Sequence, residues 1–239
     1  MDFAVSKLFL SLSMLCTVVS GTLRHFDHQP AAVQAALQTA PPPAAHPSFR
    51  VRVVGQGRAL LLLAGLGCSG AVWDQTVAHY SKNYQCHVGS LAGFAGNAPI
   101  AGLPIASTRQ ELLACVRQQQ LQKTVVVGHS LGGFLALAAE APAQFGQVVV
   151  LDALPFGAAA AQPELTEAQV RQAGPSPDAL GQQFAALPPT QFAQVQRRLL
   201  APAVTDTARL RQLLTERLQS DPATLGGALA EMLQTDLRP

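Results

Sequence analysis

Short apolar runs recur along the middle of the chain, and they predict the strands of a buried sheet. Residues 49–54 alternate between apolar and basic side chains, the pattern of a half-exposed strand. Residues 59–64 are apolar throughout and follow a glycine-containing turn, which is typical of a strand buried on both faces in a parallel sheet. Similar runs predict strands at 124–127 and 148–151, and a less apolar run predicts one at 84–88.

Helical patterns separate these runs, at residues 72–80, 107–120 and 131–143. Strands that alternate with helices predict an α/β fold, in which helices wrap a mostly parallel sheet. From residue 165 to residue 234 the chain contains only helical segments broken by prolines, and Ser220-Asp221-Pro222 has the composition of a helix start.

The first residues differ in character from the rest. Residues 8–21 are mostly apolar and follow Lys7; they are too few to span a bilayer comfortably but suit the core of a signal peptide. We therefore expect residues 1–21 to be a signal peptide and the protein to be secreted or periplasmic, with no stable membrane span after cleavage. An uncleaved anchor and a buried helix are the alternatives. Residues 22–48, rich in Ala, Gln and Pro, are interpreted as a linker.

Composition narrows the classes of partner. Hydrophobic residues make up 49% of the chain, enough for a packed core, and the net charge of +2 is small and scattered, which argues against nucleic-acid binding. Removal of the signal peptide leaves Cys68, Cys86 and Cys115, which lack metal-ligand spacing. We interpret them as small buried side chains, with a Cys86–Cys115 disulfide as the alternative. We expect no metal and no cofactor, and no pattern specifies an oligomeric state.

One motif in the sequence is typical of a catalytic site. Gly128-His129-Ser130-Leu131-Gly132 stands between the strand at 124–127 and the helix that follows, and G-x-S-x-G in that context is a nucleophile elbow. Its sharp turn requires small residues at Gly128 and Gly132. The alternative is an ordinary glycine-rich turn. We take Ser130 as the nucleophile.

A second glycine-rich loop supports this interpretation. Acyl transfer requires two donors directed at the developing oxyanion. The backbone amide of Leu131 can be one, and that of Leu66, in the loop after the strand at 59–63, can be the other. The alternative for this loop is a phosphate-binding turn, but it lacks the lysine of a P-loop and the spacing of a dinucleotide motif.

On these motifs residues 49–155 resemble the α/β-hydrolase superfamily. The stretches Leu-Ala-Gly-Phe-Ala-Gly (91–96) and Leu-Asp-Ala-Leu-Pro-Phe (151–156) resemble an exported bacterial, esterase-like subgroup. The resemblance implies an N-terminal core at 49–155 and a helical cap at 156–234. Residues 235–239 would then begin the C-terminal part of the core, and we expect the last strands of the fold to be missing from a truncated chain.

Two positions depart from the family pattern. Ala64-Gly65 stands where members often carry His-Gly, which leaves the amide donor in place. Ser90 stands where an aspartate is frequent.

The resemblance implies a serine hydrolase that acts on a small-molecule ester or related acyl substrate through an acyl-enzyme. The family order is Ser, then an acid, then His. No histidine follows Ser130; we expect His79, His87 and His129 to be packing or surface residues, and Asp152 is a candidate acid. The chain is therefore expected to be inactive as given. The alternatives are a non-catalytic ligand-binding protein and an acyltransferase or cofactor-free peroxidase relative.

Overall fold

A computed structural model describes residues 47–101, 104–121, 123–140, 145–160 and 162–239. The predicted signal peptide and nearly all of the predicted linker lie outside these residues. Within them, no helix is both long enough and apolar enough to cross a membrane.

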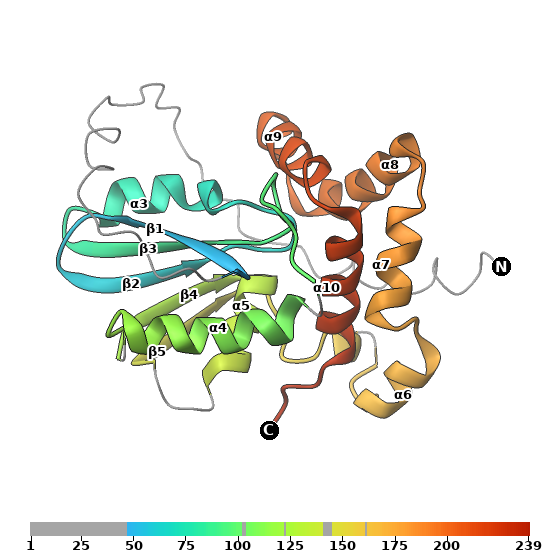
Figure 1. Ribbon diagram of the computed structural model, residues 1–239, viewed down its shortest axis with the longest axis horizontal. Helices are drawn as coiled ribbons and strands as arrows, with labels where there is room; N and C mark the ends of the chain where they lie inside the picture. Colours follow the sequence, from blue (N-terminus) through green and yellow to red (C-terminus); the bar gives the residue numbers. More distant parts are fainter. Residues whose placement is uncertain (1–46, 102–103, 122, 141–144, 161) are drawn as a thin grey trace.

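The described residues form one five-stranded sheet with the strand order β1-β3-β2-β4-β5 (Figure 1). Its strands are β1 (Phe49–Val54), β2 (Arg58–Leu63), β3 (Tyr84–Leu91), β4 (Val125–His129) and β5 (Gln147–Leu151). β1 is antiparallel to β3, and the other pairs are parallel. All five strands were predicted from the apolar runs, and the mostly parallel sheet is confirmed.

The strand β3 is three residues longer than its sequence pattern predicts. It lies between β1 and β2, and its last residue, Leu91, pairs with Phe49 of β1. Gly89 and Ser90 interrupt the apolar run, but pairing on β1 continues through both of them. Tertiary pairing therefore extends the strand beyond its local apolar signal.

Helices cover both faces of the sheet, with α3 on one side and α4 and α5 on the other (Figure 1). These are α3 (Asp74–Tyr80), preceded by the 3-10 turn η2 (Gly70–Trp73), α4 (Pro104–Gln118) and α5 (Leu131–Glu140). Alternate residues of β2 enter different cores: Leu61 joins the α4 and α5 side and Leu62 joins the α3 side. This period of two explains why β2 is apolar throughout.

A group of five α-helices follows β5 and lies at one end of the sheet (Figure 1). They are α6 (Glu167–Ala173), α7 (Pro177–Ala185), α8 (Pro189–Leu200), α9 (Thr207–Leu218) and α10 (Pro222–Gln234), with short 3-10 turns at Gly157–Ala160 and Ala201–Ala203. We call residues 156–234 the cap. Pro177, Pro189 and Pro222 begin helices, because a proline in the first turn has no amide to leave unpaired. The predicted start at Ser220-Asp221-Pro222 is confirmed: Asp221 is the N-cap and accepts a 2.7 Å bond from the Thr224 amide.

The cap shares its core with the sheet. Leu225, Ala228 and Leu229 of α10 are buried in the same cluster as Leu131. The Glu231 carboxylate accepts a 2.9 Å hydrogen bond from the Ile105 amide in the first turn of α4. Desolvation raises the pKa of Glu231, and the bonds from the α4 backbone oppose this rise. Helix α10 is therefore fixed to the core by apolar packing and by a buried polar contact.

Candidate active site

Ser130 lies in the turn between β4 and α5, directly beyond the carboxyl end of the sheet. Its φ of +51° is in the left-handed region, which is strained for a residue with a side chain. The turn is held in place because the Ser130 amide donates to the Leu151 carbonyl at 2.9 Å and the Phe134 amide donates to the Ser130 carbonyl at 3.0 Å. The predicted strand–turn–helix context of the motif is present.

The glycines on either side of Ser130 are fixed by close backbone contacts. A Cβ on Gly128 would overlap the backbone of Gly132, and a Cβ on Gly132 would overlap the backbone carbonyl of Leu63 at the end of β2. Small residues are required at these two positions because backbone atoms approach each other there, and no side-chain motion could relieve the overlap with an added Cβ.

The loop after β2 lies beside the serine. A Cβ on Gly65 would be 3.3 Å from the Cβ of Ser130. Leu66 and Leu131, whose amides are the predicted oxyanion donors, are both buried. Within the described part of the chain neither amide donates a hydrogen bond. For Leu131 this is ordinary, because the amides in the first turn of a helix have no partner inside the helix. Neither amide therefore has a hydrogen-bond acceptor among the described residues.

The cap holds this loop from the other side. The carboxylate of Glu216, near the end of α9, accepts 3.0 Å hydrogen bonds from both the amide and the hydroxyl of Ser69. The Ser220 hydroxyl contacts the Gly67 carbonyl at 3.4 Å. The loop that carries Leu66 is therefore positioned by residues that are about 150 positions further along the chain.

The three candidate histidines lie in different environments. His129 has Nδ1 3.0 Å from where a Cβ of Gly65 would stand, so its ring lies against the same glycine as Ser130. Desolvation lowers the pKa of His129, and the Asp152 carboxylate opposes this. His87 is buried within β3, with Nε2 3.0 Å from Oε1 of Gln85, and burial lowers its pKa. His79 is exposed on α3 and packs edge-on against Tyr80.

Neither His87 nor His79 is placed to serve Ser130. His87 pairs with Leu61 in the middle of the sheet, whereas Ser130 lies beyond the end of β4. Asp152 directly follows β5 with a φ of +50°, and the preceding Leu151 carbonyl bonds to Ser130. Of the predicted candidates, the structure thus brings His129 and Asp152 to the elbow.

Residues 60–236 match the model of a protein family described as the alpha/beta hydrolase family. The chain belongs to this family. It is 31% identical over 191 residues to the pimeloyl-[acyl-carrier protein] methyl ester esterase of Vibrio parahaemolyticus, a match that covers 77% of this chain and 70% of the relative. It is 32% identical over 205 residues to the protein of the same name from Aeromonas hydrophila, covering 80% and 74%.

Solved structures of hydrolases share the fold. An esterase from Exiguobacterium antarcticum aligns with a TM-score of 0.62 at 16% identity, covering 80% of this chain and 71% of that one. A thermophilic esterase from Thermogutta terrifontis aligns with a TM-score of 0.61 at 17% identity, covering 82% and 72%. By family this α/β-hydrolase is a hydrolase-like enzyme, as its motifs indicated.

The cysteines of this α/β-hydrolase are not part of the site. Cys68, Cys86 and Cys115 are free and buried, so the alternative of a Cys86–Cys115 disulfide is wrong. Cys86 belongs to the cluster on the α3 face and Cys115 to that on the α4 face, so the sheet separates them. Burial raises the pKa of each thiol, which keeps all three protonated and unreactive.

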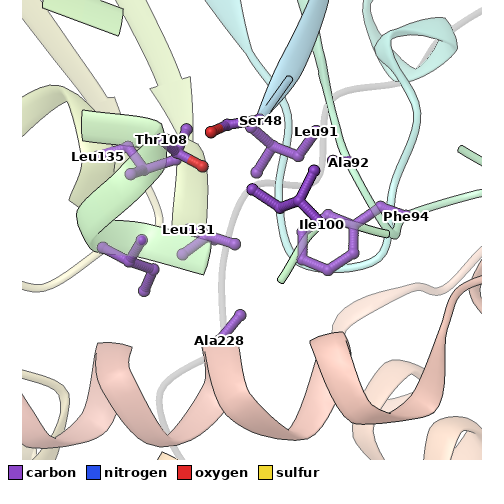
Figure 2. Close-up of a pocket in the computed structure, with 10 residues that line it drawn as sticks. Ser48, Leu91, Ala92, Phe94, Ile100, Thr108, Leu131, Leu135 and Ala228 are labelled. Atoms are coloured by element: carbon purple, nitrogen blue, oxygen red, sulfur yellow. The ribbon is translucent and has the colours of Figure 1, made fainter. Parts of the chain in front are cut away.

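An apolar pocket adjoins the elbow of the hydrolase (Figure 2). Leu131 and Leu135 of α5, Phe94 after β3 and Ala228 of α10 line it, and the Thr108 side chain lies at its polar end. The pocket is bounded by both the core and the cap. Sequence analysis predicted neither this pocket nor the role of Glu216, since both depend on how α9 and α10 dock.

Proposed function

We propose that Ser130 is the nucleophile of a carboxylic ester hydrolase that acts on a small-molecule ester through an acyl-enzyme. The observation that carries this proposal is the arrangement at the elbow. Ser130 is held at a φ of +51° against Gly65, and the backbone amides of Leu66 and Leu131 have no acceptor in the described residues. The relatives named as methyl ester esterases support an ester as the substrate.

The arrangement suits acyl transfer in two steps. The Ser130 hydroxyl oxygen attacks the carbonyl carbon of the ester while a base takes its proton. The Leu66 and Leu131 amides stabilise the negative oxygen of the tetrahedral intermediate; removal of one such donor typically costs about 10²–10³ in kcat. The alcohol leaves with a proton, and water then hydrolyses the acyl-enzyme.

The apolar surroundings of the elbow support an aliphatic ester as the substrate. Leu131 contributes its side chain to the small apolar pocket, and its amide is one of the two proposed oxyanion donors. Apolar side chains beside the elbow favour an aliphatic group over a sugar or a nucleotide.

We also propose that these 239 residues by themselves turn over esters slowly. None of their histidines follows Ser130. Of the histidines that the structure describes, only His129 has its ring nitrogen against the loop beside the serine, and it is the immediate chain neighbour of Ser130. A hydroxyl without a well-placed base is a weak nucleophile at neutral pH.

A fluorophosphonate probe tests the nucleophile assignment. We would apply it to a fusion in which the C-terminal segment of the Vibrio parahaemolyticus esterase follows residue 239, because the family order places an acid and a histidine after the serine. Peptide mass spectrometry is expected to find the adduct on Ser130, with no adduct in the Ser130→Ala variant. An adduct on a different serine contradicts the assignment. A folded fusion without any adduct favours the alternative of a non-catalytic ligand-binding protein.

We further propose that the protein is exported, because residues 8–21 have the length and polarity of a signal-peptide core. Expression in a bacterial host with fractionation is expected to yield protein outside the cytoplasm, with a new N-terminus near Gly21 or Thr22. N-terminal sequencing measures this directly. Soluble cytoplasmic protein that retains Met1 would exclude export by cleavage.

A further inference from the structure

Helix α9 of the cap contacts the loop that carries one of the proposed oxyanion donors. We call residues 64–69, between β2 and η2, the donor loop. Oε2 of Glu216 accepts 3.0 Å hydrogen bonds from both the amide and the hydroxyl of Ser69, at the end of this loop. Two turns earlier on α9, the Arg209 guanidinium donates to the carbonyl of Val72 in η2 at 3.4 Å. One helix of the cap therefore contacts the chain on both sides of the junction between the loop and η2.

Three successive amides at this junction have acceptors of different origin. The Cys68 amide donates to a carbonyl within the loop at 3.2 Å, and the Gly70 amide donates to the Ser90 hydroxyl of β3 at 2.9 Å. Between them, the Ser69 amide donates to Glu216. The core and the cap thus hold neighbouring residues of the same loop, and Glu216 is the acceptor that the cap contributes.

The Glu216 carboxylate is directed mainly at this loop. Its other oxygen, Oε1, accepts a longer hydrogen bond, of 3.4 Å, from Gln212 on the same helix. Arg209 and Arg217 also lie beside the loop, but neither forms an ion pair with Glu216 among the described residues. Hydrogen bonds to a carboxylate are roughly twice as strong as those between neutral groups. Of the described hydrogen bonds between α9 and the loop, those to Glu216 are therefore expected to be the strongest.

We propose that Glu216 is a positioning residue for ester hydrolysis, because it fixes the donor loop through Ser69 and so holds the Leu66 amide where the oxyanion forms. This inference rests on the proposed function, which assigns Leu66 as a donor. Glu216 itself touches neither the substrate nor Ser130 in this scheme. The oxyanion hole is then complete only while α9 is docked on the core, and the cap contributes to the rate of the reaction.

The proposal predicts a loss of kcat with little change in KM. An oxyanion donor interacts with charge that develops in the transition state, and it contributes little to binding of the neutral ester. Displacement of a reacting group by about 1 Å costs up to about 10²-fold in rate, and complete loss of a donor costs about 10²–10³-fold. Because Ser90 still holds the Gly70 amide when Glu216 is removed, we expect a smaller loss, of about 30-fold.

Steady-state kinetics of the fusion with p-nitrophenyl butyrate test this prediction. Glu216→Ala is expected to lower kcat about 30-fold and to leave KM within about twofold of the parent. Glu216→Gln is expected to lose only about threefold, because the amide oxygen accepts the same two bonds without the charge. Glu164→Ala, which removes an exposed carboxylate elsewhere in the cap, is the matched control and should keep full turnover. Titration with the fluorophosphonate probe counts the active sites, so that an unfolded fraction does not lower the measured kcat.

A transition-state analogue separates positioning of the oxyanion donor from a general effect on the fold. A trifluoromethyl ketone adds to a serine nucleophile and forms a negatively charged tetrahedral oxygen like that of the intermediate. Its Ki for Glu216→Ala is expected to rise by the factor by which kcat/KM falls, about 30-fold. A purely structural role would leave the Ki of the folded molecules unchanged.

Hydrogen exchange of the 239-residue chain tests the loop without requiring catalysis. In Glu216→Ala the Ser69 amide loses its acceptor, so faster exchange at that amide is expected in any case. The informative amides are those of Cys68 and Gly70, whose acceptors remain in the variant. Both are expected to exchange about tenfold faster, because the loop opens more often when the cap no longer holds it. NMR measures the rate at each amide.

Several results would overturn the proposal. These are a kcat of Glu216→Ala within about twofold of the parent, a loss confined to KM, or an unchanged Ki of the ketone. Faster exchange at Ser69 alone would show that Glu216 does not position the loop. Each of these results leaves labelling of Ser130, and hence the hydrolase proposal, standing. A folded fusion without labelling would refute the hydrolase proposal, and Glu216 would then be a structural contact of the cap even with faster exchange at Cys68 and Gly70.

Discussion

Replacement of Ser130 by alanine in the fusion is expected to lower kcat for p-nitrophenyl butyrate on the order of 10⁵-fold, because removal of a serine nucleophile leaves only the catalysis of the oxyanion donors and of binding. The fold should be unchanged, since the variant lacks one oxygen. Stopped-flow and steady-state measurements of p-nitrophenolate release give both the burst and the turnover rate.

The 239-residue chain provides the second half of this prediction. It is expected to hydrolyse the same ester at a rate within about threefold of its own Ser130→Ala variant, since removal of the base costs about as much as removal of the nucleophile. Ser81→Ala, a change at the end of α3, is the control in the fusion and should leave turnover unaltered. Fast, Ser130-dependent hydrolysis by the 239 residues alone would show that they contain the base, with His129 as the first candidate.

Gly132→Val is expected to prevent folding, with a loss of more than about 4 kcal/mol in the free energy of unfolding. The added Cβ would overlap the backbone of Leu63 and Ala64. Leu63 ends the central strand β2, which is paired on both edges, so the strand cannot move aside. Urea denaturation followed by far-UV circular dichroism measures the effect on the 239-residue chain.

Gly96→Ala is the matched control for this prediction. Gly96 has a positive φ, +80°, and the nearest atom to an added Cβ is 3.9 Å away, the side-chain oxygen of Gln219. The only cost is backbone strain, about 1 kcal/mol. A Gly132→Val chain that unfolds at a urea concentration near that of Gly96→Ala would refute the close packing between the elbow and β2.

The local pattern of the sequence was sufficient for most secondary structure and for the elbow. Residues 59–64 predicted β2 because a strand that is buried on both faces carries apolar side chains on both. Ser130 was identified because its motif depends on a strand before it and a helix after it, both of which have periodic signals. The helix starts at Pro177, Pro189 and Pro222 follow from chemistry within one turn.

Tertiary structure alone decided what surrounds the serine. The contact of Glu216 with Ser69 joins residues 147 positions apart, and no local pattern encodes such a pairing. Arg217 is an unremarkable arginine on an amphipathic helix in the sequence, and it becomes a buried cation only because α9 docks on the loop after β2. Local periodicity specifies which residues avoid water, whereas the docking of helices specifies which of them meet, and the surroundings of Ser130 depend on the second.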